Sequence, residues 1–249
     1  LPLSRGLGDV YKRQFKRREN MKIKILLTLL TASFSVSSFT EVAECYSWNA
    51  NPGKSAQFMS TVQEAAVIHT KLGANIGVYA MNVGGIGQEI QYCMRWDNLL
   101  DWGKSKDKMA QSQEMQAFFA KASQNPTGTL VATISGANLD QSAKADLFDK
   151  PMAFQVQVWE VAPGKTLEVI ANFQEAEKII ESLGLQVEIY QETAGGNGKM
   201  HYVVSADNWT KLSEGFAALG TSDKWNKFVA SVSPNVAKLI STHNGSSMN

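Results

Sequence analysis

The sequence predicts an α+β fold that consists of two tandem copies of one β-α-β-β-α-β unit. The first observation is an internal repeat, because Trp48–Lys54 (WNANPGK) returns 111 residues later as Trp159–Lys165 (WEVAPGK). The second is that further matches keep their order, and Asp97–Asn98 meets Asp207–Asn208 after a slip of one residue. The third is that strand and helix patterns alternate in the same order in both copies. Such a repeat constrains the architecture before any other feature.

The two units are placed at residues 44–139 and 153–243. A short polar linker over residues 140–152 joins them, and a tail over residues 244–249 follows the second unit. The repeat region is long enough to bury a proper core, either as one domain or as two small ones.

Each unit begins with a strand. Over residues 153–159, the apolar Phe154, Val156 and Val158 alternate with other side chains, which is the period of two expected of a strand with two different faces. The counterpart in the first copy is the run 45–49. A Pro-Gly pair then ends the strand in both copies.

An amphipathic helix follows the strand, over residues 55–72 in the first copy and 166–183 in the second. From Leu167 onward, apolar residues recur at steps of three and four, which places them on one helix face. Gly73 and Gly184 come directly after the two helices, where a left-handed residue commonly ends a helix.

A β-hairpin comes next in each unit. The four strands are expected at residues 75–81, 88–95, 186–191 and 199–205. The glycine-rich runs Gly84–Gly87 and Gly195–Gly198 lie between the strands of each pair and are typical of hairpin turns. These glycines are therefore assigned to turn geometry and not to phosphate binding.

A second helical region and a last strand complete each unit. The helical residues are 109–123 in the first copy and 209–219 with 222–231 in the second. Asp97–Asn98 and Asp207–Asn208 precede these regions and are suited to cap a helix. The first copy ends in a strand at 130–135, and its counterpart at 237–241 is either a strand or a frayed tail.

The order β-α-β-β-α-β makes an antiparallel sheet with both helices on one face. Because the other face must also be covered, two copies are expected to pack sheet against sheet and close a barrel with the helices outside. A strand, a turn containing Gly-Lys (Pro52–Lys54, Pro163–Lys165) and an amphipathic helix resemble the dimeric α+β barrel superfamily, which includes the NIPSNAP and antibiotic-biosynthesis-monooxygenase groups. The resemblance implies two tandem ferredoxin-like units that form an intrachain dimeric α+β barrel, as a monomer with pseudo-twofold symmetry or as a homodimer.

The front of the chain is not expected to belong to the fold. Residues 1–20 carry six Lys and Arg residues and no apolar periodicity, and they resemble translated adapter sequence; the alternative is a genuine basic arm. Residues 21–43 have the basic start, short apolar core and small residues of a secretory signal. Cleavage after Ser38 or after Ala43 fits this pattern, and export to the periplasm or the medium is expected.

The net charge limits the classes of binding partner that are expected. Removing the residues before Phe39 leaves 16 Lys and Arg against 21 Asp and Glu, a net charge of −5. Without a basic cluster to neutralise a phosphate backbone, no nucleic-acid partner is expected. No stretch after the signal is long enough to span a membrane, so no membrane partner is expected after cleavage.

The chain has two cysteines, Cys45 and Cys93. An exported protein meets oxidising conditions, so a disulfide is allowed. In the expected fold the first and third strands are antiparallel neighbours, and the two cysteines can face each other there; Val156 and Val204 take their places in the second unit. The alternative is a pair of small buried thiols. No metal site is expected, because no C-x-x-C occurs and the histidines are scattered.

Three histidines are candidates for chemistry. His69 lies on a helix where the second unit has Ile180, which favours a packed role. His243 falls in the expected tail and should be solvated. His201 lies on a central strand, matched with Ile90, and if it points into the barrel it could act as a general base. The alternative for His201 is a hydrogen-bonded structural histidine.

The aromatic residues suggest a ligand site. Trp48 and Trp159, and likewise Tyr79 and Tyr190, are paired by the repeat, and Gln157 shares a strand face with Trp159. A mostly apolar cavity with a few polar groups is what a small-molecule site needs. The alternative is that these rings fill the core, as side chains usually do in small barrels.

Two hypotheses follow for function. The first is an exported, non-catalytic module that binds a small apolar or aromatic molecule or has a structural role, without a cofactor. It fits the missing G-x-S-x-G, H-E-x-x-H and phosphate-loop motifs. The second is a cofactor-free monooxygenase or isomerase that acts on a small aromatic or apolar molecule. It requires His201 and at least one of Trp48 and Trp159 to line a common cavity.

Overall fold

The computed structural model describes residues 40–85 and 87–248. In this part of the chain, eight antiparallel strands close into a barrel in the order β1-β3-β2-β8-β5-β7-β6-β4. Six α-helices and one 3-10 helix accompany them, so the fold is mixed α+β as predicted. The predicted leader (1–20) and the predicted signal up to residue 39 lie outside the described residues.

The first half of the barrel contains four strands and three helices. They are β1 (Val42–Ala50), α2 (Ser55–Lys71), β2 (Asn75–Val83), β3 (Glu89–Trp96), α3 (Leu99–Gln111), α4 (Gln113–Gln124) and β4 (Gly128–Asn138). The 3-10 helix η1 (Ala145–Phe148) follows within the predicted linker.

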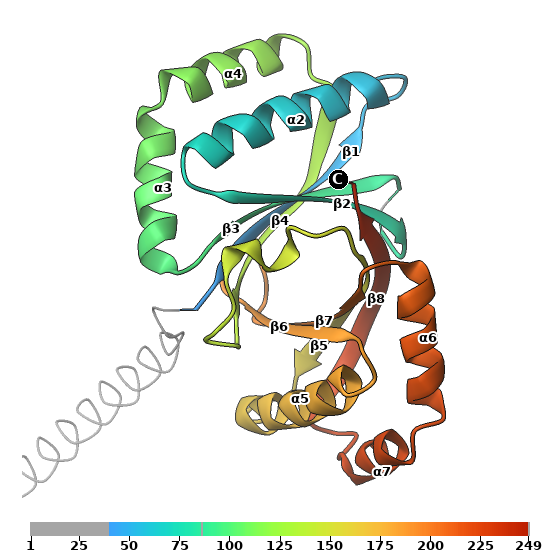
Figure 1. Cartoon of the computed structure of the whole chain (residues 1–249). Helices are drawn as coiled ribbons and strands as arrows, with labels where there is room; N and C mark the ends of the chain where they lie inside the picture. The colour runs from blue at the N-terminus through green and yellow to red at the C-terminus, as the bar shows by residue number, and fades with distance from the viewer. Residues whose placement is uncertain (1–39, 86, 249) are drawn as a thin grey trace, which may run out of the picture. The chain divides into compact units, whose positions relative to one another are not determined.

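The second half repeats this order. Its elements are β5 (Ala153–Val161), α5 (Thr166–Glu181), β6 (Gln186–Glu192), β7 (Met200–Ala206), α6 (Trp209–Gly220), α7 (Asp223–Ser231) and β8 (Ala237–Ser247). Figure 1 shows α2, α3 and α4 on one side of the barrel and α5, α6 and α7 on the other.

Both halves use the same strand order, β4-β1-β3-β2 and β8-β5-β7-β6, and two seams join them. At one seam β2 pairs with β8, and at the other β6 pairs with β4. Helices cover the outer face of each sheet, and the inner faces meet in the barrel. Three layers of side chains result: one helix–sheet layer in each half, and the barrel interior between them.

Cross-strand register shows which positions correspond. Cys45 pairs with Cys93 in the first half, and Val156 pairs with Val203 in the second. The offset is therefore 111 along β1 and β5 but 110 along β3 and β7. The counterpart of Cys93 is thus Val203 and not Val204.

The same register places His201 opposite Val158, as Gln91 lies opposite Ser47. His201 therefore corresponds to Gln91, and the predicted match with Ile90 is off by one residue. The slip falls in the glycine-rich turn, where one residue can be lost without disturbing either strand. The shift moves His201 to the barrel-facing side of β7.

Local signals in the sequence explain the helix ends. The side chain of Asn98 accepts a hydrogen bond from the backbone N–H of Asp101, and Asn208 accepts one from Lys211. The predicted N-caps are therefore confirmed for the asparagines. Gly73 has φ +100° directly after the α2 C-terminal turn, a left-handed conformation that favours glycine.

Three boundaries differ from the prediction. β1 begins at Val42 and Glu41 is fully buried, so residues 42–43 of the predicted signal region belong to the barrel and Glu41 packs against it. β8 runs to Ser247, and most of the predicted tail is a strand because it pairs with β2. The first half also contains α3, which begins at Leu99, whereas the predicted helix began only at residue 109. The helix was not predicted because it has several lysines and buries only Ser105.

A disulfide joins Cys45 and Cys93, which lie directly opposite each other on β1 and β3. Cys93 is 1% exposed, and both sulfurs belong to side chains that line the barrel interior. The bond closes a loop of 48 residues that contains α2 and β2. A cross-link of that size is expected to stabilise the fold by about 4 kcal/mol through the unfolded chain.

The double substitution Cys45→Val with Cys93→Val gives the first half the valine pair that the second half has at Val156 and Val203. The free energy of unfolding should fall by up to about 4 kcal/mol, because the unfolded chain regains its freedom. Guanidinium unfolding of this variant and of reduced wild type should give similar midpoints, both below that of oxidised wild type. Equal midpoints for all three proteins would contradict the stabilising role.

Candidate functional site

The helix–sheet layer of the first half is filled by large side chains. Trp96 is 1% exposed and Phe58 is 4% exposed, and Met94 packs in the same cluster. Phe58 lies against Gly128, where an added Cβ would come within 2.4 Å of its ring. Gly128 thus makes room for Phe58.

Several corresponding positions of the second half carry smaller side chains. Register places Ala206 where the first half has Trp96, and Val204 where it has Met94. In α5, Val169 stands where α2 has Phe58, and Ala237 pairs with Val161 as Gly128 pairs with Ala50. Three of these exchanges remove side-chain volume, whereas Ala237 adds a methyl group at the position of Gly128.

A cavity of about 550 Å³ occupies this layer of the second half; it is named here the outer cavity. It lies between the outward face of β5, β7 and β8 and the helices α5, α6 and α7. Aromatic side chains make up much of the lining: Trp159, Phe173, Tyr202, Phe216, Trp225 and Phe228. Every lining side chain is uncharged, and most are apolar.

A few polar groups lie among these rings. The indole Nε1 of Trp159 is buried and has no hydrogen-bond partner among the described residues. Gln157 donates to Gln155 Oε1 over 3.0 Å. Burial raises the pKa of Tyr202, and Glu177 and Glu181 raise it further, so this phenol stays protonated at neutral pH. The outer cavity can therefore offer hydrogen-bond donors but no charge.

In the first half, a polar cluster takes up the corresponding space. Glu44 accepts hydrogen bonds from Trp102 Nε1 at 2.6 Å, Lys106 Nζ at 2.6 Å and Tyr46 Oη at 2.9 Å. Because the second half has Leu212 and Phe216 on α6 at the positions of Trp102 and Lys106, no such cluster forms there.

His69 is buried in the first half and lies 2.7 Å from Tyr92 Oη. Burial lowers the pKa of His69 to about 4, with a further contribution from Lys106. His69 therefore has the packed role that the sequence favoured.

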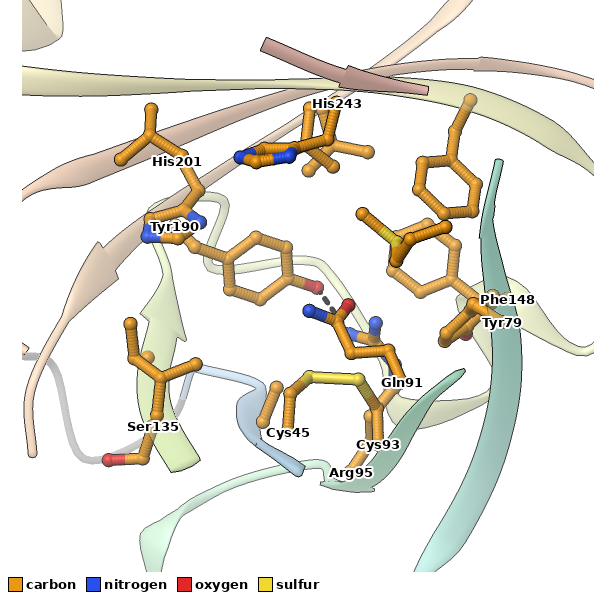
Figure 2. A pocket seen from close by; sticks show the side chains of 18 of the residues that line it. Cys45, Tyr79, Gln91, Cys93, Arg95, Ser135, Phe148, Tyr190, His201 and His243 are labelled. Atoms are coloured by element: carbon orange, nitrogen blue, oxygen red, sulfur yellow. Dashed lines mark hydrogen bonds between the residues drawn. A yellow bond between two sulfur atoms is a disulfide. The ribbon is translucent and has the colours of Figure 1, made fainter. Parts of the chain in front are cut away.

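The barrel interior contains a second, smaller cavity of about 170 Å³. His201, Tyr79 and Tyr190 all line it, and Figure 2 shows His201 above Tyr190, across the cavity from the Cys45–Cys93 disulfide. His243 lines it as well, on β8, with Nδ1 2.7 Å from the carbonyl oxygen of Gly84. His243 lies on strand β8 and not in a tail, and it is partly exposed.

His201 is held by a carboxylate. Its Nε2 lies 2.8 Å from Glu192 Oε1, and the backbone N–H groups of Asn197 and Lys199 donate to Glu192 Oε2 over 2.8 and 2.9 Å. Burial alone would raise the pKa of Glu192, but the hydrogen bonds from His201 and the backbone outweigh it and lower the pKa to about 2. Glu192 thus closes the β6–β7 hairpin and orients His201.

The sequence-predicted site residues therefore separate into two groups. Trp159 and Gln157 line the outer cavity, whereas His201, Tyr79 and Tyr190 line the barrel interior on the opposite face of the sheet.

Trp48 packs against Phe58 in the filled layer of the first half, with ring centroids 6.2 Å apart. His201 lines the barrel interior, and neither Trp48 nor Trp159 lines it.

Several residues of these sites are not among those predicted from the sequence. Phe173 contacts both Trp159 and Tyr202, with ring centroids 5.8 and 5.0 Å away. Its place on the apolar face of α5 could have indicated a contact with the sheet. Glu192 is the other omission, and its position three residues before the Gly195–Gly198 turn is a signal for carboxylate capture of turn N–H groups.

No group of three or more His, Cys, Asp or Glu side chains in residues 40–85 and 87–248 is placed to hold a metal ion. No helix over the same residues is both long and apolar enough to cross a membrane.

Comparison with known proteins gives similarity of fold alone. No protein-family model matches the sequence, and no curated protein matches it. Among solved structures, a proposed monooxygenase from Fusobacterium nucleatum has a TM-score of 0.57 at 10% identity, over 86% of this chain and 94% of that one.

Two further structures have a TM-score of 0.53 and 11% identity. A proposed chlorite dismutase covers 84% of this chain and 95% of its own, and an anthrone oxidase-like protein covers 86% and 93%. The fold is thus similar to those of proposed monooxygenases and chlorite dismutase-like proteins.

The low pKa of Glu192 makes a prediction about acid stability. A carboxyl with a folded pKa of about 2 and an ordinary pKa of 4.5 stabilises the fold fully above pH 4.5, and this contribution is lost as the pH falls toward 2. Urea unfolding of wild type and Glu192→Gln should show wild type more stable at pH 7, with a difference that shrinks between pH 4.5 and pH 2. A difference that stays constant down to pH 2.5 would contradict this account.

Proposed function

We propose that this protein binds a small aromatic or apolar molecule in the outer cavity. The observation that carries the proposal is a cavity of about 550 Å³ lined by aromatic and aliphatic side chains, in a layer that the first half fills. Volumes of about 300–1,000 Å³ with a mostly apolar lining and a few polar groups are typical of small-molecule sites.

The lining also indicates the chemistry of the ligand. The unpartnered Nε1–H of Trp159 would be satisfied by one acceptor oxygen, while the surrounding rings favour a flat apolar body. Because every lining side chain is uncharged, a charged ligand would lose its hydration without compensation. A polycyclic aromatic ketone meets all three requirements.

We further propose that the two halves are tandem ferredoxin-like units of the dimeric α+β barrel superfamily. The equal strand order and the matched register support this assignment. The proposal does not choose between the NIPSNAP and monooxygenase groups. Export, as the sequence predicts, remains part of the proposal, and the Cys45–Cys93 disulfide supports it because such bonds persist in oxidising compartments.

A second candidate function is oxygenation of the bound molecule, and the names of two fold neighbours favour it, a proposed monooxygenase and an anthrone oxidase-like protein. Anthrone is a three-ring aromatic ketone, and its oxygenation consumes one O₂ and gives anthraquinone and water. The step needs a base to remove a proton from the CH₂ group of the central ring. Tyr202 is protonated at neutral pH and His201 lies on the other face of the sheet, so the lining supports binding better than catalysis.

Anthrone kept under nitrogen is therefore the first probe. At about 100 times its dissociation constant, it should stabilise the native protein by about 2.7 kcal/mol, seen as a rise in Tm. The variant Val169→Phe with Ala237→Gly copies Phe58 and Gly128 and places an additional ring in the outer cavity; it is called the filled variant. Its affinity for anthrone should fall at least about tenfold, which is about 1.4 kcal/mol.

The matched control makes the reverse exchange in the first half, Phe58→Val with Gly128→Ala, and should retain the wild-type affinity at the outer cavity. Unchanged anthrone affinity in the filled variant would contradict the proposal.

An oxygen electrode tests the second candidate function. Oxygen uptake in air that exceeds the spontaneous rate, and that disappears in the filled variant, would establish oxygenation. Binding without such uptake leaves the binding function alone.

A further inference from the structure

The barrel interior holds a buried ion pair that the outer cavity does not use. Arg95 Nη1 lies 3.1 Å from Glu41 Oε1, and the two side chains are only 9% and 0% exposed. Arg95 Nη1 also donates to Tyr190 Oη over 2.7 Å, a contact visible in Figure 2. The ring of Phe148, from η1 in the linker, lies 4.1 Å from the Arg95 guanidinium carbon.

Three buried polar atoms of this region have no hydrogen-bond partner within the described chain. They are Arg95 Nε, Glu41 Oε2 and Tyr79 Oη. Tyr79 is 3% exposed, and its hydroxyl lies where a Cβ on Gly77 would be within 2.0 Å, so the glycine gives it room. Buried polar groups are almost always satisfied in native proteins. Arg95 Nε–H and the Tyr79 hydroxyl therefore each have the capacity for one further hydrogen-bond partner.

The fold itself does not require this ion pair. Ser205 takes the position on β7 that Arg95 has on β3, because Ser205 pairs with Phe154 as Arg95 pairs with Ala43. Met152 precedes β5 at the place that Glu41 takes before β1. The second half thus builds the same sheet without either charge. Because a buried ion pair seldom adds stability over apolar packing, the pair is better explained by recognition.

The composition of the interior defines what it can recognise. Apolar walls come from Phe148, Phe154, Val156, Val203 and the Cys45–Cys93 disulfide, and the cavity is also lined by the polar residues Glu89, Gln91, Ser135, Glu192, His201 and His243. The polar end offers two donors, Arg95 Nε–H and the Tyr79 hydroxyl. Glu41 already neutralises the charge of Arg95, so an anion would meet no net positive charge. A neutral molecule with one acceptor oxygen fits better.

We propose that the barrel interior is a second binding site, which takes a single-ring neutral molecule with a hydroxyl group, such as a phenol. The cavity of about 170 Å³ is close to the ~150 Å³ of an engineered apolar cavity that binds benzene. The ring lies among the apolar walls, and the hydroxyl oxygen accepts from Tyr79 and Arg95. This site is separate from the outer cavity and stands whether or not that cavity binds anthrone.

Phenol, benzene and benzoate test the site by titration calorimetry on the full chain. Phenol should bind more tightly than benzene, which has no acceptor, and than benzoate, which is charged. The variant Tyr79→Phe should weaken phenol binding about three- to tenfold through the loss of one hydrogen bond. The control Tyr92→Phe removes a buried hydroxyl that bonds His69 outside the interior, and it should leave the phenol affinity unchanged.

The location of phenol is read directly in wild type by methyl NMR. Intermolecular NOEs should join its ring protons to the methyl groups of Val156 and Val203, which line the interior, and not to those of Val229, which lines the outer cavity. NOEs to Val229 alone, equal affinities for phenol and benzene, or no binding of any of the three compounds would overturn the inference, the last result indicating an interior filled by water.

Discussion

Burial of both faces of each sheet is the constraint on which this structure depends. A four-stranded sheet with helices on one face leaves its other face apolar, and here the two halves cover each other. The seams β2–β8 and β6–β4 close the barrel and leave no free edge. Every other feature of the described chain, including both cavities, is positioned by this closure.

Because the backbone plan is shared, differences between individual side chains decide where space remains. Phe58 against Gly128 fills one helix–sheet layer, whereas Val169 against Ala237 leaves the other open. In the barrel interior, only the first half carries a buried ion pair, Arg95 with Glu41. The two halves have therefore kept a common fold while they acquired different interiors, which is where specific recognition can reside.

The repeat allowed the element order, the barrel and the helix caps to be predicted, because these features depend on local patterns that both copies share. Period-two alternation placed Gln157 beside Trp159 but could not tell which face points inward, since both faces of a barrel strand are apolar. The position of His201 was off by one because the slip occurs in a glycine-rich turn. The Arg95–Glu41 pair was not predictable while Glu41 was assigned to a signal segment.

The central claim is that the second half has an apolar cavity in the layer that the first half fills. Diffraction from crystals under xenon pressure tests it directly, because xenon enters dry apolar cavities. The account predicts xenon among Phe173, Trp225 and Val204, and none beneath α2 beside Phe58. Xenon in both layers, or α5 and α7 packed onto the sheet with no xenon between them, would contradict it.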